Sequence, residues 1–166
     1  MNDETRQLIH KLRTMEERVA QLEAANLSLS AADILASVQT TGTWTPALAF
    51  GGAAVGMTYT TQSGLYVRIG ALVFYRARLQ LSAKGTSTGA VSISGLPFNI
   101  LDSFGHSLIN SYFANLASIV GAIFGLAAGG TKIISLYMSG SATAAGLTEA
   151  NFTDTSRVDF WGVYQA

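Results

Sequence analysis

The first thirty residues carry a heptad pattern, which limits their structure more than any other feature of the chain does. Between residues 8 and 22 the apolar residues follow one another at alternating gaps of four and three. This is the spacing at which helices pack against each other in a coiled coil. A helical coiled coil is therefore predicted. Its seam, at heptad positions a and d, consists of Leu8, Leu12, Met15, Val19, Leu22, Asn26 and Leu29.

Charged residues beside this seam favour parallel helices. Lys11 and Arg18 take position g, and Glu16 and Glu23 take position e. Each base therefore faces an acid five residues further along a parallel neighbour. The alternative is one amphipathic helix docked on its own domain, which has the same apolar stripe with a less ordered flank. The regular charges favour the coiled coil.

The stretch from Arg18 to Glu23 predicts the number of helices. It has Arg at g, aliphatic residues at a and d, and Glu at e, and it resembles the trimerisation motif of short parallel coiled coils. Asn26 at position a is the opposing feature, since a buried Asn selects dimers in some coils and fixes register in others. A trimer is predicted, with Arg18 and Glu23 joining the seam residues in holding it.

Charge divides the chain into two unlike parts. Residues 1–33 hold four basic and six acidic residues, and the rest of the chain holds six basic and four acidic residues. We expect a stalk at residues 1–30, a linker at 31–41 and a domain at 42–166. Because a short helix is marginal alone, the domain is expected to trimerise as well.

Composition disfavours several classes of partner and chemistry. The formal net charge is zero, so no broad field attracts nucleic acid or an anionic membrane. The absence of cysteine removes disulfides, thiolate nucleophiles and cysteine zinc sites. The charged start of the chain is unlike a secretory signal, and no export signal is expected.

From Gly42 onward a two-residue alternation of apolar and polar residues replaces the helical period, and glycines mark most junctions. This pattern is typical of strands separated by turns. The fold class predicted is mainly β, with a parallel trimeric coiled-coil helix followed by an antiparallel, jelly-roll-like β-sandwich. Strands are predicted at 43–50, 57–62, 65–69, 71–81, 90–94, 108–116, 119–126, 132–138 and 157–164.

The strand predicted at 71–81 has two different faces. Its odd-numbered residues from Val73 to Leu81 are apolar, whereas the even-numbered residues from Phe74 to Gln80 include two arginines. The first face is expected in the core and the second in solvent or at a subunit interface.

Between Asp102 and Lys132 no residue carries a formal charge, so a membrane span must be weighed. Polar residues and four glycines interrupt the apolar run. The segment is expected to form a strand pair packed on a threefold axis, without membrane insertion.

Three short stretches carry a family resemblance. Residues 42–46 read Gly-Thr-Trp-Thr-Pro, 64–70 read Gly-Leu-Tyr-Val-Arg-Ile-Gly, and 94–98 read Ser-Gly-Leu-Pro-Phe. Together with the closing residues 152–164, they resemble the C-terminal knob, or receptor-binding, domain of bacteriophage tail fibre proteins. The resemblance covers residues 42–166. It implies a homotrimer of the virion whose N-terminal stalk attaches to a baseplate, tail or capsid protein and whose knob binds a bacterial surface receptor, with a glycan expected.

Adhesion, not catalysis, is what this resemblance implies. His10 lies on the stalk and His106 in a Gly- and Ser-rich stretch, so one chain offers no histidine metal cluster. The acids of the domain are scattered, whereas polysaccharide cleavage needs a carboxylate pair. No enzyme activity, cofactor or metal is expected. The scattered acids of the domain are Asp102, Glu149, Asp154 and Asp159.

Receptor-binding residues are sought where rings and polar groups gather, because sugar sites combine a stacking ring with hydrogen-bonding groups. Against a site, the same rings can belong to the core and the polar residues can cap turns. A second cluster, Arg68, Arg76 and Arg78, is expected to meet acids of a neighbouring subunit rather than an anionic glycan. The receptor-binding candidates are Asn99, Asp102, Phe104, His106 and Tyr112.

Two other functions remain open at this point. A head fibre or capsid decoration protein would use the same stalk and knob in a structural role. A secreted trimeric signalling module with a jelly roll is disfavoured because no secretion signal is seen.

Overall fold

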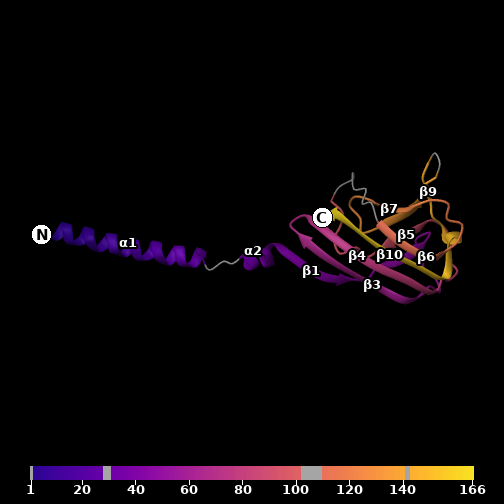
Figure 1. The fold of residues 1–166 in the computed structure, drawn as a ribbon, viewed down its shortest axis with the longest axis horizontal. Helices are drawn as coiled ribbons and strands as arrows, with labels where there is room; N and C mark the ends of the chain where they lie inside the picture. Colours follow the sequence, from indigo (N-terminus) through magenta and orange to yellow (C-terminus); the bar gives the residue numbers. More distant parts are fainter. Residues whose placement is uncertain (1, 28–30, 102–109, 141–142) are drawn as a thin grey trace. The chain divides into compact units, whose positions relative to one another are not determined.

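The structure is a computed structural model that describes residues 2–27, 31–101, 110–140 and 143–166. It divides into two compact units, Met1–Gln39 and Thr40–Ala166 (Figure 1). The first unit contains helices α1 (Asp3–Leu27) and α2 (Ala31–Val38). Helix α2 occupies most of the segment for which a linker is predicted, and β1 starts directly after it, at Gln39.

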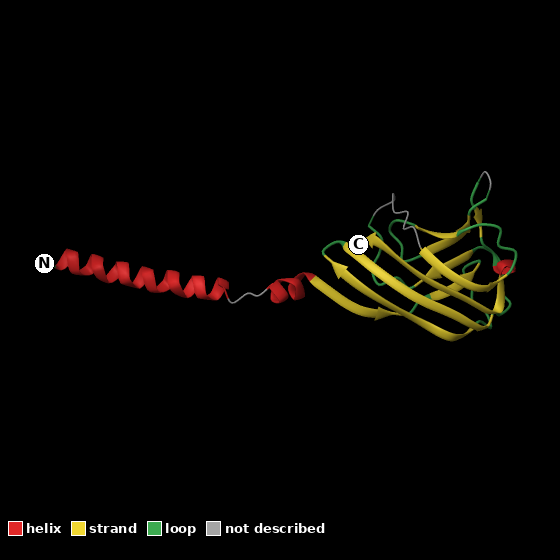
Figure 2. Ribbon diagram, in the orientation of Figure 1, coloured by secondary structure: helices red, strands yellow, loops and turns green. Residues whose placement is uncertain are grey.

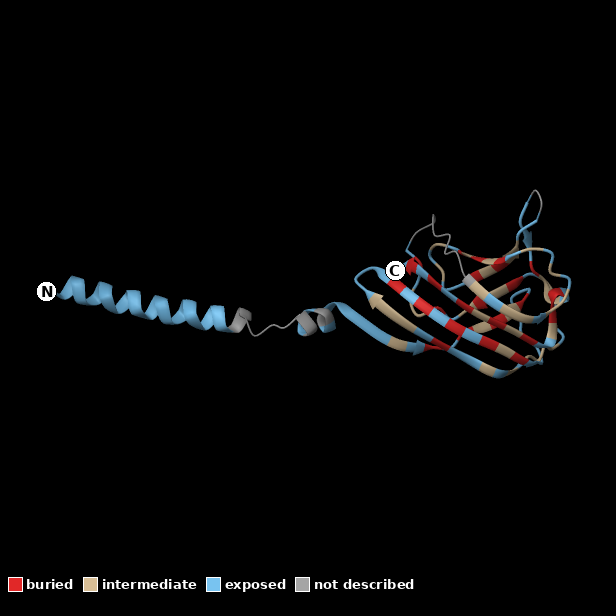
Figure 3. Ribbon diagram, viewed as in Figure 1, coloured by how far each residue is buried: buried red, intermediate tan, exposed pale blue. Residues whose placement is uncertain are grey.

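Helix α1 begins at a side-chain cap. The Asn2 side-chain oxygen Oδ1 accepts a hydrogen bond from the backbone N–H of Thr5 at 2.9 Å, which satisfies one of the free donors of the first turn. Asp3 and Glu4 follow in that turn, where acids interact favourably with the helix dipole. Every side chain described between residues 2 and 24 is exposed (Figure 3).

The second unit is an antiparallel β-sandwich, hereafter the sandwich, as the alternation predicts (Figure 2). One sheet has the order β1-β3-β4-β10-β6 and the other the order β2-β5-β8-β7, with β9 also paired to β8. A 3₁₀ turn at Glu149–Asn151 precedes β10. The strands are β1 (Gln39–Trp44), β2 (Ala47–Phe50), β3 (Thr58–Ile69), β4 (Leu72–Ala83), β5 (Val91–Ser94), β6 (Asn110–Leu116), β7 (Ile123–Ala127), β8 (Ile134–Met138), β9 (Ala145–Gly146) and β10 (Phe152–Gln165).

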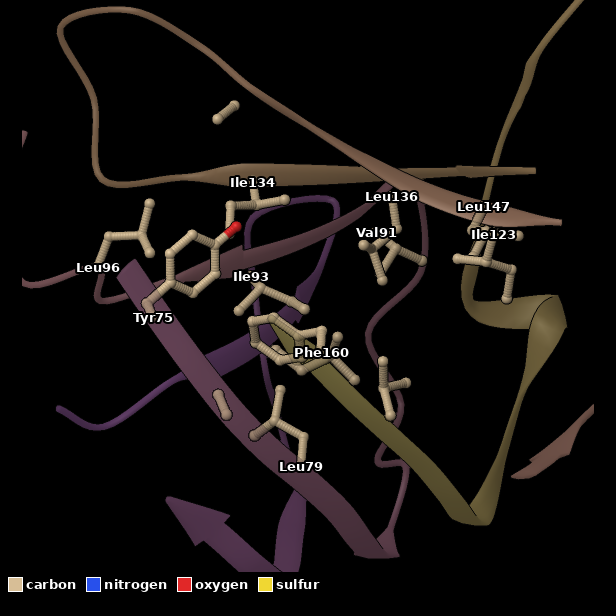
Figure 4. Close-up of a cluster of buried hydrophobic side chains, with 14 of the residues drawn as sticks. Tyr75, Leu79, Val91, Ile93, Leu96, Ile123, Ile134, Leu136, Leu147 and Phe160 are labelled. Carbon is tan, nitrogen blue, oxygen red and sulfur yellow. The ribbon is translucent and has the colours of Figure 1, made fainter. Parts of the chain in front are cut away.

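The core lies between the two sheets. Strand β4 alternates buried and exposed residues along most of its length, and the odd-numbered residues from Val73 to Leu81 are the buried ones, as predicted. Figure 4 shows Tyr75, Leu79 and Phe160 in one cluster with Ile93 and Ile134 of the other sheet. Burial of these apolar side chains is the main contribution to the stability of the sandwich.

The prediction of one strand at 43–50 is wrong, because the chain changes sheets there. Trp44 ends β1 in the first sheet, and Ala47 begins β2 in the second. Pro46 lies between them, and a proline has no N–H to give to a strand ladder. Pro46, Leu48 and Phe50 are nevertheless buried together with Trp44, so the alternation continues across the break.

The two strands predicted at 57–62 and 65–69 form a single strand, β3. Gly64, which lies between the two predicted strands, is a buried residue within β3. A Cβ at this position would collide with the indole of Trp44. Gly64 therefore makes room for a neighbouring ring, one of the known uses of glycine in a strand.

The two strands in the described part of the uncharged segment, β6 and β7, do not pair with each other. Strand β6 pairs with β10 and β7 pairs with β8, so the two strands belong to different sheets. Among the described residues, no helix combines the length and the apolar character that crossing a membrane requires.

Candidate functional site

The outward side of the sheet β1-β3-β4-β10-β6, called the outer face here, exposes an unusual number of large apolar side chains. Seven of them, from four neighbouring strands, are 42% to 60% exposed. Soluble proteins rarely leave so continuous an apolar surface uncovered unless it binds something. The seven residues are Leu65, Ile69, Leu72, Phe74, Tyr112, Trp161 and Val163.

Strand register divides this outer face into two halves. In the apolar half, Phe74 lies between Val67 and Val163, and the next outward row pairs Ile69 with Leu72. The aromatic half contains two further rows that include charged residues. These rows are Leu65, Arg76 and Trp161, and then Ser63, Arg78, Asp159 and Tyr112.

Two hollows lie on the outer face. One, of about 630 Å³, is lined by Thr61, Ser63, Arg78, Tyr112 and Asp159, among others. The other, of about 650 Å³, extends over the apolar half to Phe74 and to β1. Leu65, Arg76 and Trp161 line both hollows, so these three residues stand at the centre of the outer face.

Asp159 is the hub of an ion-pair network in the aromatic half. The Arg78 guanidinium donates two hydrogen bonds to its carboxylate, each 2.9 Å long, and Arg157 donates two more. The Arg157 hydrogen bonds are the largest cause of a pKa of Asp159 below its ordinary value, Arg78 adds to the effect, and partial burial opposes it. Arg157 also lies 5.3 Å from the centre of the Tyr112 ring, which positions that ring by a cation–π contact.

Arg76 differs from its neighbours in the same face. Within the part of the chain that the structure describes, its guanidinium makes no hydrogen bond, ion pair or cation–π contact, although it is exposed between Leu65 and Trp161. An arginine carries five N–H donors in a fixed planar arrangement. Arg76 is therefore free to hold a planar anion.

The arginine cluster expected from the sequence is divided by the fold. Arg68 lies on the other side of β3, where its guanidinium is 4.6 Å from the centre of the Phe98 ring and its Nε donates to the Gly70 carbonyl at 2.8 Å. Of these three arginines, Arg76 and Arg78 share the outer face. Arg78 is expected to meet an acid of a neighbouring subunit, but Asp159 of the same chain pairs with it.

The structure does not bring the described receptor-binding candidates together. Tyr112 lies in the aromatic half, whereas Asn99 lines a separate hollow of about 520 Å³ with Arg68 and Lys132. Tyr112 is opposite Asp159, and the segment of Asn99 joins β10 at Gln165. Six residues of an extended strand separate the two by about 20 Å. Asp102, Phe104 and His106 lie outside the described residues.

Two central residues of the outer face, Arg76 and Trp161, were absent from the predicted receptor site. The alternation in 71–81 puts Arg76 on the face that is predicted to meet solvent or another subunit. Trp161 belongs to the closing residues 152–164, which contribute to the family resemblance. Only the pairing of β4 with β10 sets them side by side. In the described ranges, no three His, Asp or Glu side chains gather closely enough to hold a metal ion.

The fold of the chain is similar to part of a phage tailspike. The crystal structure of Dettilon tailspike protein (gp208) matches 76% of this chain with a TM-score of 0.66 and 16% sequence identity. The match covers 24% of the tailspike, so the two proteins share the fold of that part. No protein family matches the sequence, and a search of curated proteins finds no match either.

Proposed function

We propose that this chain is a homotrimeric fibre protein of a bacteriophage virion. In this proposal the helical segment attaches to a baseplate, tail or capsid protein, and the sandwich binds a glycan on the host cell. The observation that carries the proposal is the likeness of the fold to part of a phage tailspike.

Helix α1 supports the trimer. The seam side chains of Leu8, Leu12, Met15, Val19 and Leu22 are all 52% to 68% exposed. A helix gains most of its stability from packing its apolar face. Copies of this chain in parallel would bury these side chains and pair the charges beside them. Asn26 belongs to α1, but its side chain, like all of Leu29, lies outside what the structure describes.

The apolar half of the outer face supports association of the sandwich. Strand β1 lies beside β3, and Gly42 is next to Tyr66 while Trp44 is next to Gly64. The start of β1 is therefore at the end of the sheet that carries Ile69 and the apolar half. An exposed apolar surface of this extent is typical of a protein interface, and in this proposal copies of the apolar half contact one another in the trimer.

The first experiment measures the mass of the full chain by sedimentation equilibrium. A trimer has a mass of about 52 kDa, three times the 17.4 kDa of the chain. The second applies the labelled full chain to a panel of bacterial strains and competes binding with each strain's purified surface polysaccharide. A trimer whose binding the polysaccharide inhibits supports the proposal.

Two results would contradict this function. If the full chain is a monomer, the proposal of a trimeric fibre is wrong. If it is a trimer that binds no strain, the structural alternative is favoured, namely a head fibre or capsid decoration protein. In the second case, labelling of the protein on the virion would show its place on the head.

A further inference from the structure

We propose that the aromatic half of the outer face binds a carboxylate-bearing sugar of an acidic glycan, with Arg76 holding the carboxylate and Trp161 stacking on the sugar ring. This inference rests on the proposed function and names the class of its ligand. Of the described candidates at 99–112, Tyr112 belongs to the site and Asn99 lines a separate hollow.

The guanidinium of Arg76 has no partner among the described residues. Its cross-strand neighbours on the outer face are Leu65 and Trp161, neither of which can accept a hydrogen bond from it through a side-chain oxygen. Arginine pairs best with a planar carboxylate through two parallel hydrogen bonds. The partner that this position lacks is thus an anion.

The three acids that the structure describes in the sandwich already accept hydrogen bonds, which favours an anion from outside the protein; Asp102 lies outside the described residues. Glu149 accepts a hydrogen bond from the N–H of Gly89 at 2.7 Å, and Asp154 accepts one from the N–H of Lys84 at 2.8 Å. Asp159 is held by Arg78 and Arg157.

Local charge favours an anionic ligand. Among the residues that the structure describes, Arg76, Arg78 and Arg157 lie on the outer side of β4 and β10, with Asp159 as the acid between them. This region therefore carries an excess of positive charge in a chain whose total formal charge is zero. Such an excess raises the local concentration of anions and orients them as they approach.

The surroundings of Arg76 have the chemistry of a sugar site. Trp161 and Tyr112 are 58% and 60% exposed, and exposed rings of this kind provide flat apolar surface together with a polar group. The hydroxyl-bearing residues Thr61 and Ser63 line the same hollow. Its volume of about 630 Å³ falls in the range of small-molecule sites.

The test uses the full chain and an array of bacterial and synthetic glycans that contain glucuronic, galacturonic or N-acetylneuraminic acid. Each acidic glycan is printed beside its carboxyl-reduced form, in which a neutral hydroxymethyl group replaces the carboxylate. We expect the chain to bind at least one acidic glycan. Its carboxyl-reduced partner should bind at least about tenfold more weakly, because charge-assisted hydrogen bonds are lost.

Three variants locate the site, with dissociation constants measured on the best acidic glycan. Arg76→Gln and Trp161→Leu are each expected to weaken binding by about tenfold or more. Arg68→Gln is the matched control, since it removes the same charge from the separate hollow near Phe98, and its binding should equal that of the unaltered chain. Melting curves of all three verify that the variants are folded.

Equal binding of acidic and carboxyl-reduced glycans would overturn the inference. So would full binding by Arg76→Gln, or loss of binding by Arg68→Gln alone. A trimeric chain that binds bacteria through their polysaccharide but binds no acidic glycan would overturn this inference and leave the proposed function standing. A monomeric chain that binds no strain would instead remove the proposed function.

Discussion

Trp44 lies directly against Gly64, with the edge of its indole over the glycine Cα where β1 and β3 adjoin. Trp44 also meets Tyr75 and Phe160 edge to face, at ring-centre distances of 6.1 Å in each case. Its Nε1 is buried and has no hydrogen-bond partner in the described part of the chain. Trp44 is thus held by close packing against its neighbours, and Gly64 provides the space.

Gly64→Ala should destabilise the sandwich. The added methyl group would collide with the buried indole of Trp44, and overpacking of this kind costs about 1–3 kcal/mol. The free energy of unfolding from urea titration measures the effect. Gly146→Ala is the control, because its methyl group would meet Tyr137 at an ordinary contact distance, 3.8 Å. Equal stability of both variants would contradict the packing account.

Leu22→Asp should weaken self-association of the full chain at least tenfold. The change puts a charge into the predicted apolar seam, where it must be desolvated in the coil. Gln21→Asp, one residue away and outside the seam, introduces the same charge and should leave association nearly unchanged. Sedimentation equilibrium over a range of concentrations compares the two. Equal weakening by both variants would argue against the heptad assignment.

Phe74→Ser should also weaken self-association while the subunit stays folded. Phe74 is 45% exposed in the apolar half of the outer face, so its removal costs the single sandwich less than a core change does. Val55→Ser is the matched control, since Val55 is exposed in a turn outside this face. A trimer of unchanged strength would show that the apolar half does not contact another copy.

Asp159→Asn should lower stability at neutral pH, with an effect that disappears in acid. The folded-state pKa of Asp159 lies below its ordinary value, chiefly because of the hydrogen bonds from Arg157. A lowered pKa stabilises the fold above the unfolded-state value and stops doing so as pH falls through the folded-state value. The melting temperatures of the two proteins should therefore differ near pH 7 and converge as the pH falls below the folded-state pKa of Asp159. A constant difference at both pH values would contradict this role.

Local alternation predicted the inner face of β4 residue by residue, because a two-residue period needs no knowledge of distant contacts. The same rule does not explain Gly64. In a sequence, a glycine that makes room for a ring cannot be told from a glycine in a turn, and the ring here belongs to Trp44, twenty residues earlier. Heptad spacing likewise predicts a helix in the N-terminal segment, where the structure has α1. The short helix α2, within the linker predicted at 31–41, has too few turns to show a helical period.

The candidate site was harder to predict than the fold. Asn99 and Tyr112 were grouped because they are close in sequence, but they join β10 at well-separated points. Arg76 and Trp161 are far apart in sequence and meet only through the pairing of β4 with β10. A binding surface assembled across strands depends on register, which a single sequence does not reveal.

The crossing of the chain between sheets at Thr45 and Pro46 also affects how the sandwich responds to a pulling force. Strand β1 joins the helices to the sandwich, and its continuation after two residues is β2 of the opposite sheet. The hydrogen bonds of an antiparallel ladder run perpendicular to its strands, so tension along β1 loads all of them in shear at once. Any force that passes this first ladder reaches the second sheet through β2. Tension on the N-terminal segment is thereby distributed over both layers of the sandwich.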